Sequence, residues 1–183
     1  AKPNNAYLVI IGDVDYEKIK SKVTGLFNNW ESWSVSSSDF PAPSNPDKTE
    51  IIFVDMPSST QSVVSVMNTI DFSKKESDYF AALVANRILG GGGAGRLFNN
   101  LREDKGWTYG ASSFFNASKR NGFFGMLSSV KTEATDSALI EIFKEFNSYT
   151  TTGITENELK FTKDAFLGRE ALKYETSGQK LGF

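Results

Sequence analysis

The stretch that organises this chain runs from residue 89 to residue 110 and reads LGGGGAGRLFNNLREDKGWTYG. Four glycines in a row come first, a short amphipathic segment follows them, and a turn at Asp104–Gly106 leads into alternating aromatic residues from Trp107 onward. Loops that join two rigid elements often carry binding groups. The stretch therefore predicts a glycine-rich functional loop, set between a helix before it and a strand after it.

The segments on either side of this loop include several strand patterns. Runs or alternations of β-branched and apolar residues are typical of strands. The predicted strands are residues 50–56, 61–70, 107–116 and 123–130. The last two are separated by Asn121-Gly122, a dipeptide that favours a hairpin turn.

Capping residues and apolar spacing predict the helices. Two capping boxes, Ser73–Glu76 and Thr155–Glu158, each open a helix; Gly90 ends the first, and the second runs toward residue 178. A further helix over residues 133–149 precedes a stop at Gly153. Strand pairs separated by helices indicate an α+β fold, a two-layer α/β sandwich with a mostly antiparallel sheet and helices on one face.

The front of the chain is a separate strand-helix unit. Residues 6–12, AYLVIIG, predict a buried strand, and Asp13 or Asp15 is placed to cap the helix that follows. Residues 34–49 then change to a serine- and proline-rich composition that is typical of a linker.

Composition excludes several classes of function. The 183 residues carry a formal net charge of -2, with lysines dispersed among acids, so neither nucleic acid nor an anionic membrane is an expected partner. No apolar run reaches the roughly 20 residues of a membrane span. The sequence contains no Cys and no His, which removes thiolate and imidazole chemistry and the usual zinc ligands. No feature indicates a cellular compartment.

Two side chains of the central stretch suit a carbonyl group. Arg102 lies near the end of the amphipathic segment and Tyr109 lies three residues past Gly106, so a turn there brings guanidinium and phenol together. Their N–H and O–H donors match a peptide carbonyl, or the oxyanion formed when that carbonyl is attacked. The alternative is that Arg102 pairs with a surface acid and Tyr109 is an ordinary strand aromatic.

The glycines admit two other interpretations. Gly90, Gly92 and Gly95 match G-x-G-x-x-G, but they follow a helix where a dinucleotide fingerprint needs a strand, and no acidic residue lies about 20 positions on. A nucleotide site is therefore not expected. The other interpretation is a flexible connection between helices, in which glycine allows positive φ or close packing.

The pattern L-G-G-G-x-x-x-R-L-F-x-x-L-R-E-x-x-G-x-x-Y, from Leu89 to Tyr109, resembles a known signature. It is similar to the non-catalytic half of the insulinase/pitrilysin/mitochondrial-processing-peptidase family of zinc metallopeptidases. Residues 8–30 resemble the unit that closes the family's first domain, residues 54–64 the entry to its second domain, and residues 153–168 its late helix. The resemblance covers nearly the whole chain.

The resemblance implies a function and a set of site residues. In this family one domain carries zinc on an H-x-x-E-H motif, and the second reaches across a chamber to hold the substrate near the scissile carbonyl. This chain, which lacks histidine, resembles the second domain, so no cofactor is expected in it and zinc is expected in a partner catalytic domain. The implied catalytic contacts are Arg102 and Tyr109, and the implied substrate-binding residues are Gly90, Gly91, Gly92, Gly93, Gly95 and Arg96.

The resemblance also implies a domain map and partners. Residues 1–33 correspond to the end of the preceding catalytic domain, residues 34–49 to a linker, and residues 50–183 to a truncated non-catalytic domain. The expected partners are the zinc-bearing domain, fused or separate, and a peptide or unfolded protein substrate. Residues 6–30 are expected to fill an open sheet edge of their own chain or to pair with another copy in a homodimer. The alternative function is a structural or peptide-binding scaffold subunit without proteolytic activity.

One departure from the family lies in the loop. Many members carry a serine before the arginine that aligns with Arg96, whereas this chain has Ala94-Gly95 there. A loop role that needs the serine hydroxyl is therefore not expected.

Overall fold

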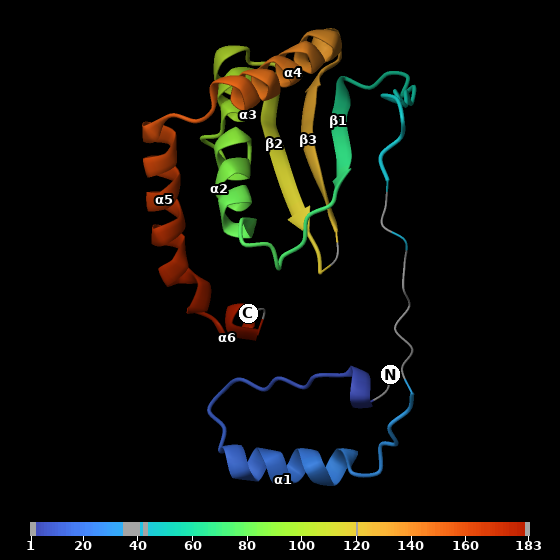
Figure 1. The fold of residues 1–183 in the computed structure, drawn as a ribbon, viewed down its shortest axis with the longest axis vertical. Helices are drawn as coiled ribbons and strands as arrows, with labels where there is room; N and C mark the ends of the chain where they lie inside the picture. The colour runs from blue at the N-terminus through green and yellow to red at the C-terminus, as the bar shows by residue number, and fades with distance from the viewer. Residues whose placement is uncertain (1–2, 35–40, 42–43, 120, 182–183) are drawn as a thin grey trace. The chain divides into compact units, whose positions relative to one another are not determined.

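The structure is a computed structural model that describes residues 3–34, 41, 44–119 and 121–181. It contains two compact units, one formed by residues 1–40 with 165–183 and one formed by residues 41–164. Figure 1 traces the chain through both. The larger unit holds the sheet and the central stretch.

The larger unit is built on a three-stranded antiparallel sheet. The strands are β1 (Gln61–Ile70), β2 (Thr108–Ala117) and β3 (Gly122–Lys131), and β3 lies between the other two. Side chains on β3 alternate between buried and exposed, with Met126 buried and Leu127 exposed. Alternation of this kind places one face of the sheet against a core and leaves the other open.

Helices cover one face of this sheet (Figure 1). They are α2 (Tyr79–Leu89), α3 (Arg96–Phe98), the π-helix η2 (Asn99–Asp104) and α4 (Thr135–Thr152), which follows the short 3₁₀ turn η3 (Thr132–Ala134). The core beneath them contains Val64, Leu89, Leu97, Leu101, Ala111, Met126, Val130, Ala138 and Ile142. This arrangement confirms the predicted α+β fold, with an antiparallel sheet and helices on one face.

The turn between α4 and α5 (Glu156–Glu170) follows the predicted signals. Gly153 ends α4 with φ of 75°, a conformation that favours glycine. The Thr155 N–H donates to Glu158 Oε2 at 2.7 Å, and the Glu158 N–H donates to the Thr155 hydroxyl at 3.2 Å, so the capping box is formed. The helix ends at Glu170 rather than near residue 178; η4 (Ala171–Tyr174) and α6 (Ser177–Leu181) follow it.

The other predicted capping box has a different outcome. The Ser73 hydroxyl accepts from the Lys75 N–H at 3.2 Å and lies 3.4 Å from a Glu76 carboxylate oxygen, which closes a turn. Lys74 donates to the Ser118 carbonyl at 2.8 Å, and this ties the turn to the end of β2. The helix itself, α2, begins only at Tyr79, so Ser73–Glu76 is not its cap.

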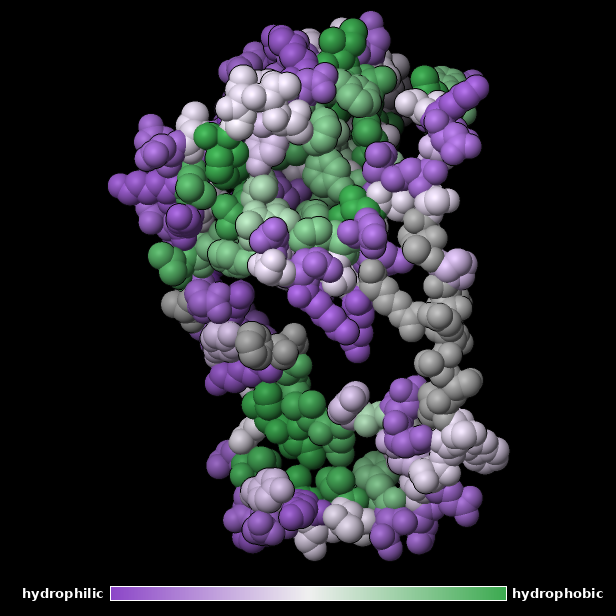
Figure 2. Space-filling view, viewed as in Figure 1, coloured by the Kyte–Doolittle hydropathy of each residue, from purple (hydrophilic) through white to green (hydrophobic). Residues whose placement is uncertain are grey.

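The front of the chain contains η1 (Pro3–Asn5) and α1 (Tyr16–Phe27). Asp15 caps α1, as predicted, by accepting the Lys18 N–H at 2.9 Å. The strand predicted over residues 6–12 is wrong: these residues form no strand, and Tyr7 is 99% exposed. Figure 2 shows hydrophobic side chains at the surface of this unit. A strand needs a partner for its backbone groups, and an isolated run lacks one.

The strand predicted over residues 50–56 is also wrong, because this segment has no strand structure and Ile51 is 86% exposed. The free edge of β1 is met by a side chain instead. The Asn45 amide donates to the Thr69 carbonyl at 2.9 Å and accepts the Thr69 N–H at 2.8 Å, which imitates a strand pair. The prediction that residues 6–30 fill the edge of their own sheet is therefore wrong for the described residues.

Candidate functional site

The glycine-rich loop is fixed at its base by close packing. The N–H groups of Gly90 and Gly91 donate to the Asn86 carbonyl at 3.0 and 2.8 Å, and the Ser113 N–H donates to the Gly90 carbonyl at 3.0 Å. A Cβ on Gly90 would lie 2.5 Å from the Ser113 nitrogen, and one on Gly95 would lie 2.8 Å from the Gly90 Cα. None of the loop glycines has a positive φ. Close approach, not turn geometry, therefore explains glycine at positions 90 and 95.

An open groove of about 510 Å³ runs between this loop and strands β2 and β3. Its lining residues are 90–93, 98, 110–113 and 127–129. Glycine backbone and serine side chains dominate that surface, and no charged side chain is among these lining residues. Because the loop follows α2 rather than a strand, it lacks the context of a dinucleotide fingerprint.

Arg102 and Tyr109 lie side by side, although neither is a lining residue of the groove. The Arg102 Cζ is 5.7 Å from the centre of the Tyr109 ring, within the range of a cation–π contact. Tyr109 is 84% exposed and directly precedes Gly110, a lining residue of the groove. Gly106, with φ of 64°, forms the turn that folds the strand back toward the helix. The predicted proximity of guanidinium and phenol is therefore present, while their role toward a substrate stays a prediction.

The backbone itself presents the Tyr109 side chain. The pairing of β2 with β3 shifts register between Thr108 and Ala111, which makes an irregularity at Tyr109 and Gly110. The Gly110 N–H donates to the Thr108 hydroxyl at 3.0 Å, and this local bond holds the shifted segment. Strand irregularities of this kind commonly re-aim a side chain beside a binding site.

The polar groups of Arg102 and Tyr109 have no hydrogen-bond or ion-pair partner within the part of the chain that the structure describes. The Arg102 guanidinium makes no hydrogen bond or ion pair there, and neither does the Tyr109 hydroxyl. The alternative in which Arg102 pairs with a surface acid is therefore not what these residues form.

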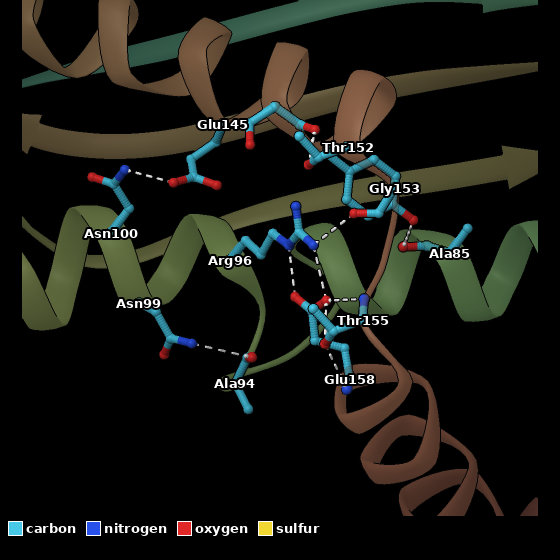
Figure 3. A network of polar contacts seen from close by, with 12 residues as sticks. Ala85, Ala94, Arg96, Asn99, Asn100, Glu145, Thr152, Gly153, Thr155 and Glu158 are labelled. Atoms are coloured by element: carbon cyan, nitrogen blue, oxygen red, sulfur yellow. Dashed lines mark hydrogen bonds and ion pairs between the residues drawn. The ribbon is translucent and has the colours of Figure 1, made fainter.

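Arg96 is arranged differently, as Figure 3 shows. Its Nε lies 2.6 Å from Glu158 Oε1 and its Nη2 lies 2.8 Å from Glu158 Oε2, a two-pronged ion pair. The Nη2 also donates to the Gly153 carbonyl at 2.8 Å. Its Cζ lies 5.2 Å from the centre of the Tyr149 ring. All of these contacts are with α4, α5 and the turn between them.

The Arg96 pair shifts the pKa values of its members. Hydrogen bonds from the Arg96 guanidinium, with smaller contributions from Thr155, hold the pKa of Glu158 at about 2. The hydrogen bond to Glu158 raises the pKa of Arg96 in turn. Burial raises the pKa of the Tyr149 phenol. Both members of the ion pair are therefore charged across the whole range in which proteins function.

A second anchor holds the π-helix that carries Arg102. The Asn100 side-chain amide donates to carboxylate oxygens of Glu141 and Glu145, both at 2.9 Å, and so ties η2 to α4. This hydrogen bond, with a further one from Lys144, lowers the pKa of Glu141. The sequence alone does not predict the contacts of Asn100 with both glutamates, because partners more than 40 residues away carry no local signal. The sequence predicts Glu158 only as a capping residue.

Two further observations concern metal binding and membrane spans among the residues that the structure describes. Among the described residues, no group of three or more Asp or Glu side chains is placed to hold a metal ion. No helix in the same residues is long and apolar enough to cross a membrane.

Comparisons with known proteins agree with this architecture. The family described as "Peptidase M16 inactive domain" matches residues 1–166. A curated relative, "Uncharacterized zinc protease YmxG" of Bacillus subtilis (strain 168), is 27% identical over 99 residues, which cover 54% of this chain and 24% of that protein.

Two solved structures extend the comparison. The peptidase M16 inactive domain from Pseudomonas fluorescens has a TM-score of 0.56 and 30% identity, with 62% of this chain and 27% of that chain covered. A protease from Helicobacter pylori has a TM-score of 0.80 and 18% identity, with 94% and 42% covered, and this likeness concerns the fold. The chain thus spans less than half of the length of each of these three proteins. The family match confirms the resemblance found in the sequence: the chain belongs to the peptidase M16 inactive domain family.

Proposed function

We propose that this chain is the substrate-holding, non-catalytic half of a zinc metalloendopeptidase. The observation that carries the proposal is the Arg102–Tyr109 pair, whose donors make no hydrogen bond or ion pair among the described residues. Tyr109 directly precedes Gly110, a lining residue of an open groove. A zinc-bearing domain, fused or separate, would polarise the scissile carbonyl and activate the attacking water. This chain would supply binding and orientation.

The chemistry of the groove supports an extended peptide as its ligand. The loop residues Gly90–Gly93 present backbone rather than side chains, so a peptide main chain is able to approach closely. The floor is neutral, and its exposed serines, Ser112 and Ser129, offer hydrogen bonds without selecting a charge. Gly95 and Arg96, the other predicted substrate-binding residues, are not lining residues of the groove, and they would act by shaping the loop.

The pair would act on the carbonyl oxygen of the bound peptide. The Arg102 guanidinium and the Tyr109 hydroxyl would each donate to it, and both bonds would strengthen as negative charge develops there. Loss of one such donor costs about 3 kcal/mol in the transition state, which is roughly a 100-fold loss of turnover.

The test uses the full-length protein or complex with its zinc-bearing domain and an unstructured peptide. Arg102→Ala and Tyr109→Phe should each lower kcat by about 100-fold without loss of folded structure by circular dichroism. Arg169→Ala, an exposed arginine on α5, is the matched control and should keep wild-type turnover. Wild-type turnover in both pair variants would refute the site. No chelator-sensitive peptidase activity in the full-length protein would favour the scaffold alternative.

The domain map and the homodimer belong to the same proposal. We expect residues 1–33 to be the end of a preceding catalytic domain and residues 34–49 to link it to residues 50–183. Pairing of residues 6–30 with another copy predicts a dimer of this chain in analytical ultracentrifugation. A monomer at all concentrations would remove that part of the proposal.

A further inference from the structure

We infer that Arg96 is a positioning residue, which fixes the glycine-rich loop and the helical run behind it to the α4–α5 turn. The inference rests on the function proposed above and assigns Arg96 a role distinct from substrate contact. Arg96 is the first residue after the loop, and its side chain is mostly buried. Three different groups of the α4–α5 corner bind its guanidinium: Glu158, the Gly153 carbonyl and the Tyr149 ring.

The α4–α5 turn holds the groups that bind the Arg96 guanidinium in fixed positions. Glu158 Oε2 accepts from the Thr155 N–H and the Thr155 hydroxyl as well as from Arg96 Nη2, so the carboxylate is held in place before the guanidinium meets it (Figure 3). Gly153 adopts its positive φ at the same turn and directs its carbonyl toward the same nitrogen. A lysine ammonium lacks the planar fork that satisfies both carboxylate oxygens and this carbonyl together.

The contact is coupled to the loop through backbone packing. Gly95, next to Arg96, lies against Gly90 so closely that no Cβ fits between them. Gly90 in turn accepts the Ser113 N–H of β2. A displacement of Arg96 is therefore expected to shift both the glycine-rich loop and strand β2, because backbone atoms packed this closely leave no space that could absorb the movement.

The contact is also coupled to Arg102. The segments α3 and η2 form one continuous helical run over residues 96–104. The run is anchored at its start by Arg96 and near its middle by Asn100, which donates to glutamates on α4. Without Arg96 a single polar anchor, Asn100, remains beside the buried Leu97 and Leu101 side chains, so the polar restraint on the run that carries Arg102 is weaker.

The first test measures hydrogen exchange in the full-length protein by mass spectrometry. Arg96→Ala and Glu158→Gln should each speed amide exchange in peptides covering residues 90–102 by about tenfold, with little change over β1 and β3. Arg169→Ala is the control for loss of an arginine. Unchanged exchange at residues 90–102 in both variants would overturn the inference, and this readout does not depend on peptidase activity.

The second test is a double-mutant cycle on turnover with the zinc-bearing domain present. Arg96→Ala should lower kcat by about tenfold, and Arg96→Lys by nearly as much, because the fork is lost in both. In the Arg102→Ala background the Arg96→Ala change should cost clearly less than tenfold, since the part of its effect that acts through Arg102 is already lost. Costs that multiply fully would overturn the inference, whereas a full-rate Arg102→Ala single variant would instead refute the proposed function.

Discussion

The base of the glycine-rich loop makes a sharp test of the fold, and Gly90→Ala is the change that probes it. A methyl group at this position would lie 2.5 Å from the Ser113 nitrogen, 2.9 Å from a Leu97 methyl carbon and 3.0 Å from the Ser112 carbonyl carbon. Two of these three neighbours are backbone atoms of β2, which cannot rotate away. Either the strand or the end of α2 must therefore shift.

The magnitude follows from those distances. Adding a methyl group to a well-packed site costs about 1–3 kcal/mol, and backbone neighbours place Gly90 at the upper end of that range. Shifting Gly90 also stretches the 3.0 Å hydrogen bond from the Ser113 N–H to its carbonyl. Alanine reduces the entropy of the unfolded chain, which offsets about 0.4–1 kcal/mol. The net expectation is a loss of about 2 kcal/mol, or about 6 °C in the thermal midpoint for a chain of this size.

Gly93→Ala is the matched control, because it is the same substitution three residues further along the same loop. Nothing lies within 4 Å of a Cβ at Gly93, and its φ is not positive. Its free energy of unfolding should equal that of the wild type or exceed it by up to about 1 kcal/mol. Urea denaturation followed by circular dichroism measures both variants. Equal midpoints for Gly90→Ala and Gly93→Ala would refute the account of the loop base.

Three further predictions concern stability. Because the pKa of Glu158 is lowered to about 2, the stabilisation from its ion pair is complete above about pH 5 and is lost as pH falls through that pKa. Wild type should therefore be more stable than Glu158→Gln by about 2 kcal/mol at neutral pH, after allowance for partial exposure. This difference in the free energy of unfolding should disappear between about pH 5 and pH 2 in urea titrations. Asn45→Ala removes the side-chain amide that pairs with Thr69, and should lower the free energy of unfolding by about 1 kcal/mol in the same assay; an unchanged midpoint would show that this contact adds nothing. Tyr149→Phe loses the 3.0 Å hydrogen bond to the Ala85 carbonyl and should cost about 1 kcal/mol, whereas a more stable variant would contradict the assignment.

Local signals in the sequence predicted local structure well. The Asp15 cap, the Thr155–Glu158 box and the Gly153 stop all appear in the structure, because a cap involves residues within one turn of each other. The prediction that Ser73–Glu76 caps a helix is wrong, because the same sequence pattern also closes a turn outside a helix.

Strands were predictable only where a partner existed. Residues 61–70 pair with β3 over their full length, which confirms the strand that their alternation of apolar and polar residues predicts. Residues 6–12 and 50–56 have equally strong apolar character but form no strand among the described residues. A strand is a property of a pair of segments, so composition alone does not decide it.

In the candidate site, too, a local signal predicts one contact and gives no indication of another. The proximity of Arg102 and Tyr109 followed from a turn at Gly106, and both lie within a few residues of it. The bond from Arg96 to Glu158 spans 62 residues and follows from how α5 meets the loop. Sequence spacing alone therefore does not distinguish the arginine that is bound internally from the one that makes no hydrogen bond or ion pair among the described residues.

Charge pairing gives a physical reason to assign substrate contact to Arg102 rather than Arg96. A substrate carbonyl that recruited Arg96 would have to displace a carboxylate held by two hydrogen bonds, and would leave Glu158 partly buried without its counter-charge. Arg102 makes no such bond within the described residues, so a carbonyl is able to bind it without breaking an existing contact. Glu103 and Asp104 follow it directly in sequence, yet neither pairs with it there. Among the described residues, the fold therefore leaves the Arg102 guanidinium without a hydrogen bond or ion pair, while it binds the Arg96 guanidinium to the α4–α5 turn.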